Sequence, residues 1–243
     1  LDLIWNDSKT VGDSAHKRLD AMCLEAVSTG YISLDTTNNP DGLTTSDIDL
    51  LMDSSHRVNA SVNWDTAATA KPITDITGIV NTASGAGTTF GKILMDRTSF
   101  LKFAATTEVI NSLVSFNQLQ KGAQVATLDK VNEYMTANML PVIEIVDVPI
   151  GIEKDGVIST IRPWQTTNIA FIPDGQLGVI KNAIAIEQLR PVTNVNYATF
   201  NRALISKWSE NEPFGEWTKV ELNAFPAFEA IDNVYLLSRT AAF

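Results

Sequence analysis

SKTVGDSAHKRLDAMCLEAVST, residues 8–29, is the stretch that decides the fold, and Gly30 follows it. Its apolar residues recur at steps of three and four, which places them in one stripe along a helix. Asp7 or Ser8 is expected to cap the helix, and Gly30 to end it in the left-handed conformation. At about 1.5 Å per residue the helix is about 30 Å long, so we expect a spine on which other elements pack. The stripe consists of Val11, Ala15, Leu19, Met22, Cys23, Ala26 and Val27.

Strand patterns occur toward both ends of the chain. Residues 31–35 alternate, and residues 48–52 are their expected hairpin partner across a turn at 38–42, although Asp47 and Asp49 equally allow a short helix. Residues 54–69 are small and polar and predict an exposed connection. We expect the terminal strands to pack on the spine helix, and those near the C-terminus are 203–208, 219–225 and 234–237.

The middle of the chain mixes helix and strand patterns. Pro72 suits the first position of a helix, and two further helices are expected after Asp96 or Thr98 and after Thr127. One is expected to bury Leu101, Ala105, Val109 and Leu113, the other Leu128, Val131, Met135 and Met139. The irregular order predicts an α+β fold rather than a doubly wound sheet. The strands expected here are 90–95, 142–152, 157–161 and 168–172.

Composition excludes several classes of protein. The 243 residues carry 28 acidic and 18 basic side chains and a net charge of −10, which argues against a protein that grips nucleic-acid phosphates. No apolar run is long enough for a membrane span. The single cysteine, Cys23, fits a core position and allows no disulfide framework. Because the chain begins at Leu1 rather than Met, we expect that an N-terminal portion was removed.

The sequence contains no recognisable catalytic or metal-binding constellation. His16 lies on the polar side of the first helix and His56 in a loop, and no Gly-x-Ser-x-Gly elbow occurs. One cysteine and two scattered histidines are too few for a zinc site, and the acidic pairs Asp47/Asp49 and Glu210/Glu212 lack the calcium-loop spacing. We therefore predict no catalytic residue, cofactor or metal. A hydrolase whose carboxylates converge only in three dimensions stays open as an alternative.

From Trp64 onward a series of short patterns follows in a fixed order. Together they resemble the major capsid protein E family of lambda-type tailed bacteriophages. Two features depart from that family: Glu212-Pro213 stands where Asp-Pro is usual, and the N-terminal arm and extended loop are missing before Leu1. The patterns are Pro72-Ile73-x-Asp75-Ile76, Lys92-Ile93-Leu94-Met95-Asp96, the hairpin at Asp155-Gly156, Asn168-Ile169-x-Phe171-Ile172-Pro173-Asp174-Gly175-x-Leu177-Gly178, Lys207-Trp208, Glu212-Pro213, Ala224-Phe225-Pro226 and a strand through Val234.

The resemblance implies the tailed-phage capsid fold. Residues 1–71 and 190–243 would form the peripheral subdomain and residues 72–189 the axial one. The implied function is that of a structural protein, not an enzyme, which assembles into pentamers and hexamers of an icosahedral shell around DNA. Its partners would be itself and other capsid or scaffold proteins, and its place the virion, assembled in the bacterial cytoplasm. A cellular nanocompartment shell of the same fold is an alternative.

The stretch 209–216 is the candidate contact between subunits. It carries Glu210, Glu212 and Glu216 around Phe214, with Trp208 and Trp217 at its base. The resemblance places such a loop where capsomers meet, and there the acids would need basic partners from neighbouring subunits, such as Arg202 or Lys207. The alternative is a solvated tip without a partner. We expect the tip to be exposed and mobile, and this shortened chain to be a monomer or a weak oligomer.

Overall fold

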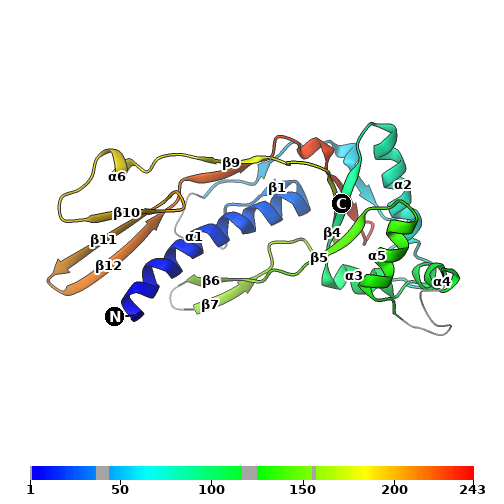
Figure 1. The fold of residues 1–243 in the computed structure, drawn as a ribbon, viewed down its shortest axis with the longest axis horizontal. Helices are drawn as coiled ribbons and strands as arrows, with labels where there is room; N and C mark the ends of the chain where they lie inside the picture. The colour runs from blue at the N-terminus through cyan, green and yellow to red at the C-terminus, as the bar shows by residue number, and fades with distance from the viewer. Residues whose placement is uncertain (1, 37–43, 117–124, 155–156) are drawn as a thin grey trace. The chain divides into compact units, whose positions relative to one another are not determined.

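The computed structural model describes residues 2–36, 44–116, 125–154 and 157–243 (Figure 1). The chain divides into two compact units, residues 1–23 with 178–229 (unit 1) and residues 24–177 with 230–243 (unit 2). Helices and strands occur in mixed order, which confirms the α+β class. The turn expected at 38–42 lies outside the described residues. The boundaries of the two units differ from those of the peripheral and axial subdomains, whose assignment stays a prediction.

Helix α1 (Asp2–Thr29) is the longest helix in the described part of the chain. It begins before Asp7 and Ser8, so the predicted caps are wrong, whereas Gly30 ends it with φ +75° as expected. Four of the seven stripe residues are buried, namely Leu19, Met22, Ala26 and Val27. Cys23 is half-buried, and burial raises the pKa of its thiol.

A five-stranded sheet forms the centre of unit 2. Its inner strand β8 (Asn168–Pro173) is buried at five successive positions, and four of these form the apolar run 169–172, as is typical of a strand covered on both faces. The last strand of the chain, β14, pairs in parallel with β3 and antiparallel with β8. The predicted strand at 234–237 therefore exists, but it completes this sheet. The order is β3 (Arg57–Asn59), β14 (Tyr235–Ser238), β8, β4 (Phe90–Asp96) and β5 (Val142–Val146).

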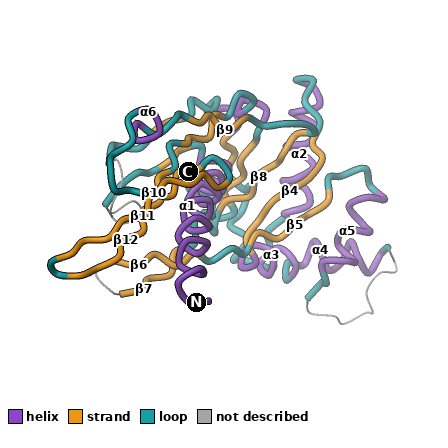
Figure 2. Tube along the Cα trace, turned by 60° about the vertical axis from the view of Figure 1, so that its left-hand side comes forward, coloured by secondary structure: helices purple, strands orange, loops and turns teal. Residues whose placement is uncertain are grey.

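Four helices lie beside this sheet (Figure 2) and close its core. Asp96 caps the first turn of α3, because its carboxylate accepts a hydrogen bond from the N–H of Thr98 at 2.7 Å. One helix is expected from the sequence after Asp96 or Thr98, but the structure has two, α3 and α4. They are separate because the backbone of Thr106 is extended and its hydroxyl donates to the carbonyl of Phe103 at 2.8 Å. The helices are α2 (Pro72–Gly85), α3 (Arg97–Ala104), α4 (Thr107–Ser115) and α5 (Leu128–Ala137).

Two residues predicted to face inward are exposed. Leu101 is 49% exposed, because α3 instead turns Phe100 and Phe103 to the core. Met139 is 92% exposed, since α5 has ended before it and its φ is +57°. Sequence periodicity extended both helical patterns past a break that it could not detect.

The segment 54–69, predicted to be an exposed connection, is partly core, so that prediction is wrong. It holds a short 3-10 helix (Ser54–His56) and strand β3. Trp64 is fully buried, its ring nitrogen donates to the Asp75 carboxylate at 3.1 Å, and its backbone N–H donates to the Arg239 carbonyl at 3.0 Å. Small polar residues flank Trp64 in the sequence, so no apolar pattern indicated that its side chain is buried.

Strand β5 is the last strand at its side of the sheet, yet its edge is not open at Ile143. The Asn132 side-chain amide on α5 accepts from the N–H of Ile143 at 2.8 Å and donates to the carbonyl of the same residue at 2.9 Å. Both main-chain groups that a further strand would use are thereby occupied.

Two small hairpins complete unit 2. Strands β1 (Tyr31–Ile32) and β2 (Ile48–Asp49) pair antiparallel, as the sequence predicted. Strands β6 (Ile150–Lys154) and β7 (Val157–Ile161) also pair antiparallel, as expected for the second hairpin, whose turn at 155–156 lies outside the described residues. The single strand predicted over 142–152 is wrong, because it is divided between β5 of the central sheet and β6 of this hairpin.

Unit 1 contains the first part of α1 and two antiparallel sheets. The larger sheet joins β10 (Asn196–Phe200), β11 (Ala203–Asn211) and β12 (Phe214–Glu221). The smaller one pairs β9 (Val179–Asn182) with β13 (Ala224–Ala227), and a short helix, α6 (Ile186–Leu189), lies between β9 and β10 in the sequence.

Candidate subunit-contact surface

A tight two-residue turn joins the first two strands of the three-stranded sheet of unit 1. Asn201 and Arg202 join β10 to β11 with φ of +45° and +69°, the left-handed pair that matches the twist of a hairpin. The Phe200 ring lies against Gly12 of α1, where an added Cβ would stand 3.4 Å from the ring. A Cβ at that distance would be in ordinary van der Waals contact with the ring, so the helix and this hairpin meet at a normal packing distance.

The stretch predicted as a polar tip is the end of the β11–β12 hairpin. Trp208 pairs with Trp217 across the strands, so these two rings lie on one face of the sheet. Phe214 and Glu216 fall on the opposite face by the period of two along β12. Most of the stretch is strand rather than loop, and the Glu212-Pro213 peptide bond at its end is cis.

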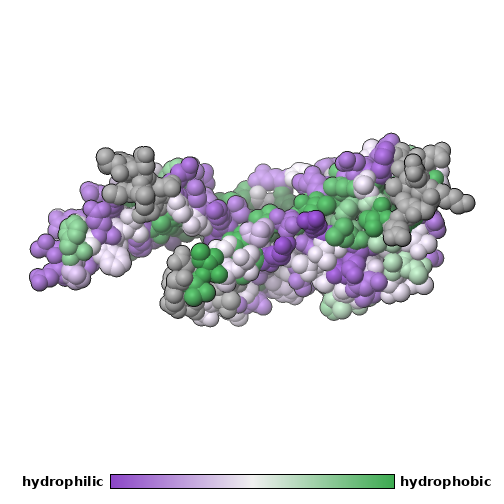
Figure 3. Space-filling model, turned by 90° about the horizontal axis from the view of Figure 1, so that it is seen from below, coloured by the Kyte–Doolittle hydropathy of each residue, from purple (hydrophilic) through white to green (hydrophobic). Residues whose placement is uncertain are grey.

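The end of this hairpin is exposed, as predicted. Phe214 is 79% exposed and Trp217 is 53% exposed. Figure 3 shows this end as mainly hydrophilic surface around a smaller hydrophobic patch. We call residues 210–217 the aromatic tip. The structure thus brings all five predicted contact residues to one hairpin.

The charges of the aromatic tip differ from the expectation at one point. Lys207, proposed as a partner for the acids of a neighbouring subunit, forms an ion pair with Glu216 of its own chain at 3.5 Å, because the two residues are diagonal neighbours on one face. Within the described part of the chain, neither Glu210 nor Glu212 forms an ion pair. These two carboxylates are free for a partner.

Unit 1 has a second feature, around α6, that the sequence patterns do not indicate. Lys219 of β12 lies 3.1 Å from Glu187 of α6 and 3.0 Å from Glu221. The hydrogen bonds from Lys219 to Glu221 and to Glu187 raise the pKa of the Lys219 ammonium. The network holds α6 on the sheet, and the spacing of Lys219 and Glu187 in the sequence, 32 residues, left no local signal of it.

His16 of α1 faces two carbonyl oxygens. Its Nδ1 lies 2.9 Å from the carbonyl oxygen of Gly12, and its Nε2 lies 3.1 Å from that of Asn201. Only the doubly protonated ring can donate to both. The hydrogen bond to Gly12, with those of Asn201 and the charges of Asp13 and Asp20, raises the pKa of His16.

We expect this contact to make unit 1 more stable in acid. Since the folded pKa of His16 is raised, its stabilisation is fully present below about pH 6.5 and is lost as pH rises through the folded value. His16→Ala should therefore lose more unfolding free energy at pH 5.5 than at pH 8.5, by at most about 1 kcal/mol because the ring is partly exposed. Urea midpoints at the two pH values measure the difference, and an equal loss at both would contradict it.

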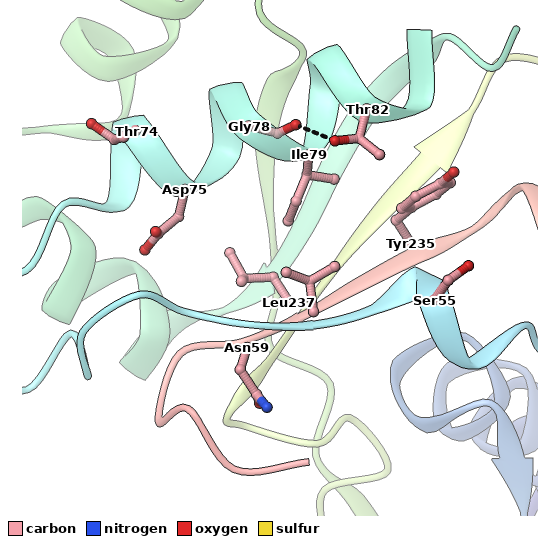
Figure 4. Close-up of a pocket in the computed structure, with 10 residues that line it drawn as sticks. Ser55, Asn59, Thr74, Asp75, Gly78, Ile79, Thr82, Tyr235 and Leu237 are labelled. Carbon is pink, nitrogen blue, oxygen red and sulfur yellow. Dashed lines mark hydrogen bonds between the residues drawn. The ribbon is translucent and has the colours of Figure 1, made fainter. Parts of the chain in front are cut away.

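One cavity of about 280 Å³ lies in unit 2 between α2 and strands β3 and β14 (Figure 4). Among the described residues that line it, Asp75 is the only carboxylate, and each of its oxygens accepts one hydrogen bond, from the N–H of Ser61 at 3.2 Å and from the ring nitrogen of Trp64 at 3.1 Å. The Thr82 hydroxyl donates to the Gly78 carbonyl at 2.9 Å. This cavity offers no paired carboxylates for hydrolysis.

The described residues show neither a cluster of metal-binding side chains nor a helix that could span a membrane. Among them no three histidine, cysteine, aspartate or glutamate side chains gather as a metal site. No helix among the same residues has both the length and the apolar character needed to cross a membrane.

Comparisons with known proteins agree with this description. A solved structure described as the capsid protein of an E. coli CFT073 prophage matches with a TM-score of 0.65 and 13% identity, over 96% of this chain and 65% of that one. A phage-related protein of Bordetella bronchiseptica RB50 matches with a TM-score of 0.55 and 12% identity, over 100% of this chain and 68% of that one. The chain thus spans about two thirds of the length of each. No curated protein sequence matches it.

These two likenesses establish the fold, and the sequence establishes the family. The sequence model of the phage major capsid protein E family matches residues 1–236. That is nearly the whole chain, and it confirms the resemblance drawn from the order of short patterns. The family is one of structural proteins and not of enzymes, in agreement with the absence of a predicted catalytic site. The chain belongs to the phage major capsid protein E family.

Proposed function

We propose that this chain is a structural component of a phage or prophage shell, whose copies contact one another to enclose DNA. The family match over residues 1–236 carries the proposal. The net charge of −10 supports it, because a shell protein contacts other subunits rather than gripping phosphates. In this function the protein assembles in the host cytoplasm, with scaffold or other capsid proteins as further partners, and ends in the virion.

The shell would be built of pentamers and hexamers, and the aromatic tip would contribute to contacts between copies. Exposed aromatic residues ringed by polar ones are the usual composition of such contacts. The proposed contact residues are Trp208, Glu210, Glu212, Phe214 and Glu216. We expect the 243-residue chain by itself to be a monomer or a weak oligomer in dilute solution.

Assembly under crowding tests the proposal. Weakly associating shell subunits assemble above a threshold concentration, since each copy gains several contacts at once. We expect negative-stain electron microscopy of the concentrated chain in polyethylene glycol to show rings or sheets with five- or six-fold repeats. Dispersed particles without any repeat, at every concentration up to the limit of solubility, would contradict a shell function.

The cavity beside α2 does not favour the hydrolase alternative, since Asp75 is its one carboxylate among the described residues and each oxygen of Asp75 already accepts a hydrogen bond. No observation favours the nanocompartment alternative over a phage shell. An enzyme that co-purifies inside the assembled particles would be the finding that revives it.

A further inference from the structure

Unit 1 exposes a second apolar surface besides the aromatic tip. Four large aliphatic side chains lie within nine residues around α6, and we call residues 184–192 the aliphatic segment. Such a concentration of exposed apolar side chains marks a contact surface rather than ordinary scattered exposure. The four side chains are Ile184, Ile186, Leu189 and Val192, which are 66%, 67%, 70% and 59% exposed.

The backbone of the aliphatic segment is held in place from both ends. The N–H of Ala183 donates to the Asn223 carbonyl at 2.8 Å, and the N–H of Val192 donates to the Tyr197 hydroxyl oxygen at 3.2 Å. Between them, Glu187 is held by Lys219 at 3.1 Å. The aliphatic side chains therefore stand outward on a fixed backbone, so a partner would bind them at little cost in conformational entropy.

The two surfaces differ in the charges that they leave without an ion pair among the described residues. The aromatic tip carries Glu210 and Glu212 without ion pairs among the described residues, and the aliphatic segment carries the exposed Arg190, which likewise has no ion pair among them. Two tips placed together would gather carboxylates without a free cation. A tip placed on the segment brings its acids near Arg190 and its Phe214 ring to aliphatic side chains. Charge complementarity thus favours a contact between the tip of one copy and the segment of another over a contact between two tips.

We infer that the aromatic tip of one copy docks on the aliphatic segment of a second copy, so that copies of this chain associate head to tail. The inference rests on the proposed shell function and names the surfaces of one of its contacts. Phe214 is the anchor, and Glu212 with Arg190 is the charged pair at the rim. Because the two surfaces differ, the contact is heterologous and closes into rings or continues as an open array.

Two single variants test the inference in the full chain. Phe214→Asp damages only the tip, and Leu189→Asp damages only the segment. Both residues are exposed, so each variant should keep the melting temperature of the wild type within about 2 °C. By sedimentation velocity over a concentration series, each alone should self-associate at least about tenfold more weakly than the wild type. An equimolar mixture should form a one-to-one pair that grows no further, because each variant keeps one intact surface.

Several results would overturn the inference. Self-association of the Leu189→Asp variant with wild-type strength would show that tips meet one another instead. A mixture that stays monomeric would show that the two surfaces do not recognise each other, and a wild-type chain without any self-association at the highest concentration of the series excludes the contact outright. Met139→Asp is the matched control, since it adds a carboxylate at a side chain that is 92% exposed outside both surfaces and should leave association unchanged.

A charge exchange tests the rim pair separately. Arg190→Glu should weaken association about fivefold, and adding Glu212→Arg to the same chain should restore it to within about twofold. Failure of the double variant to recover excludes this pairing. Rings or sheets that form under crowding in the Leu189→Asp variant as readily as in the wild type would refute the docking while leaving the shell function intact. Absence of any ordered assembly in the wild type refutes the function itself.

Discussion

Trp64→Ala should lower the free energy of unfolding by about 3–5 kcal/mol, the range for removing a buried aromatic side chain. The ring is fully buried and packs on Phe103 with ring centroids 5.7 Å apart. Its N–H also satisfies the Asp75 carboxylate at 3.1 Å, so alanine leaves both a cavity and an acceptor without its donor. Guanidinium denaturation followed by circular dichroism measures the loss.

Two control variants separate the causes of this loss. Trp64→Phe fills most of the cavity but lacks the ring N–H, and it should cost about 1–3 kcal/mol. Trp217→Ala removes the same side-chain type where it is 53% exposed and should stay within about 1 kcal/mol. A Trp64→Ala loss no larger than that of Trp217→Ala would mean that Trp64 does not anchor the core of unit 2.

Leu19→Ala or Met22→Ala should cost about 2–5 kcal/mol, since each removes several buried methyl or methylene groups. Both side chains are 7% exposed, on the stripe that α1 turns inward. The loss should appear in the same denaturation experiment as a lower midpoint, and it should be larger where the surroundings cannot collapse into the space.

Lys17→Ala is the control on the same helix. Lys17 is exposed, so its truncation should change stability by no more than about 0.5 kcal/mol. Equal losses for Lys17→Ala, Leu19→Ala and Met22→Ala would show that the buried face of α1 has been assigned wrongly.

Sequence patterns predicted elements whose cause is local. The stripe of α1, its end at Gly30 and the strands at 90–95 and 168–172 follow from the side-chain period and from one glycine conformation. Each of these is decided within a few residues. Such elements were placed to within a few residues of their observed bounds, except the start of α1, where the helix extends six residues before Ser8.

Elements that depend on distant residues were missed. Trp64 is buried because its backbone bonds Arg239 and its ring meets Phe103, far along the chain. The break between α3 and α4 is fixed in part by the N–H of Thr107, which donates to the Ala67 carbonyl at 2.9 Å. No pattern of three to five residues contains that information.

The candidate contact surface shows the same division. The acidic and aromatic residues of the tip could be proposed as contact residues from the sequence, since they lie within one short stretch. The pairing of Lys207 with Glu216 needs the strand register. The aliphatic segment was missed because exposed and buried isoleucines look alike in a sequence, and only folding reveals that nothing in the described chain covers these.

The amide of Asn132 has a consequence for a protein that works in many copies. When shell proteins gather, their local concentration becomes very high, and any unpaired strand could join the sheet of a neighbour without regard to sequence. At Ile143 that route is blocked, because one side chain already imitates the next strand. Recognition between copies at this edge is left to side chains, which can distinguish a correct neighbour from a wrong one.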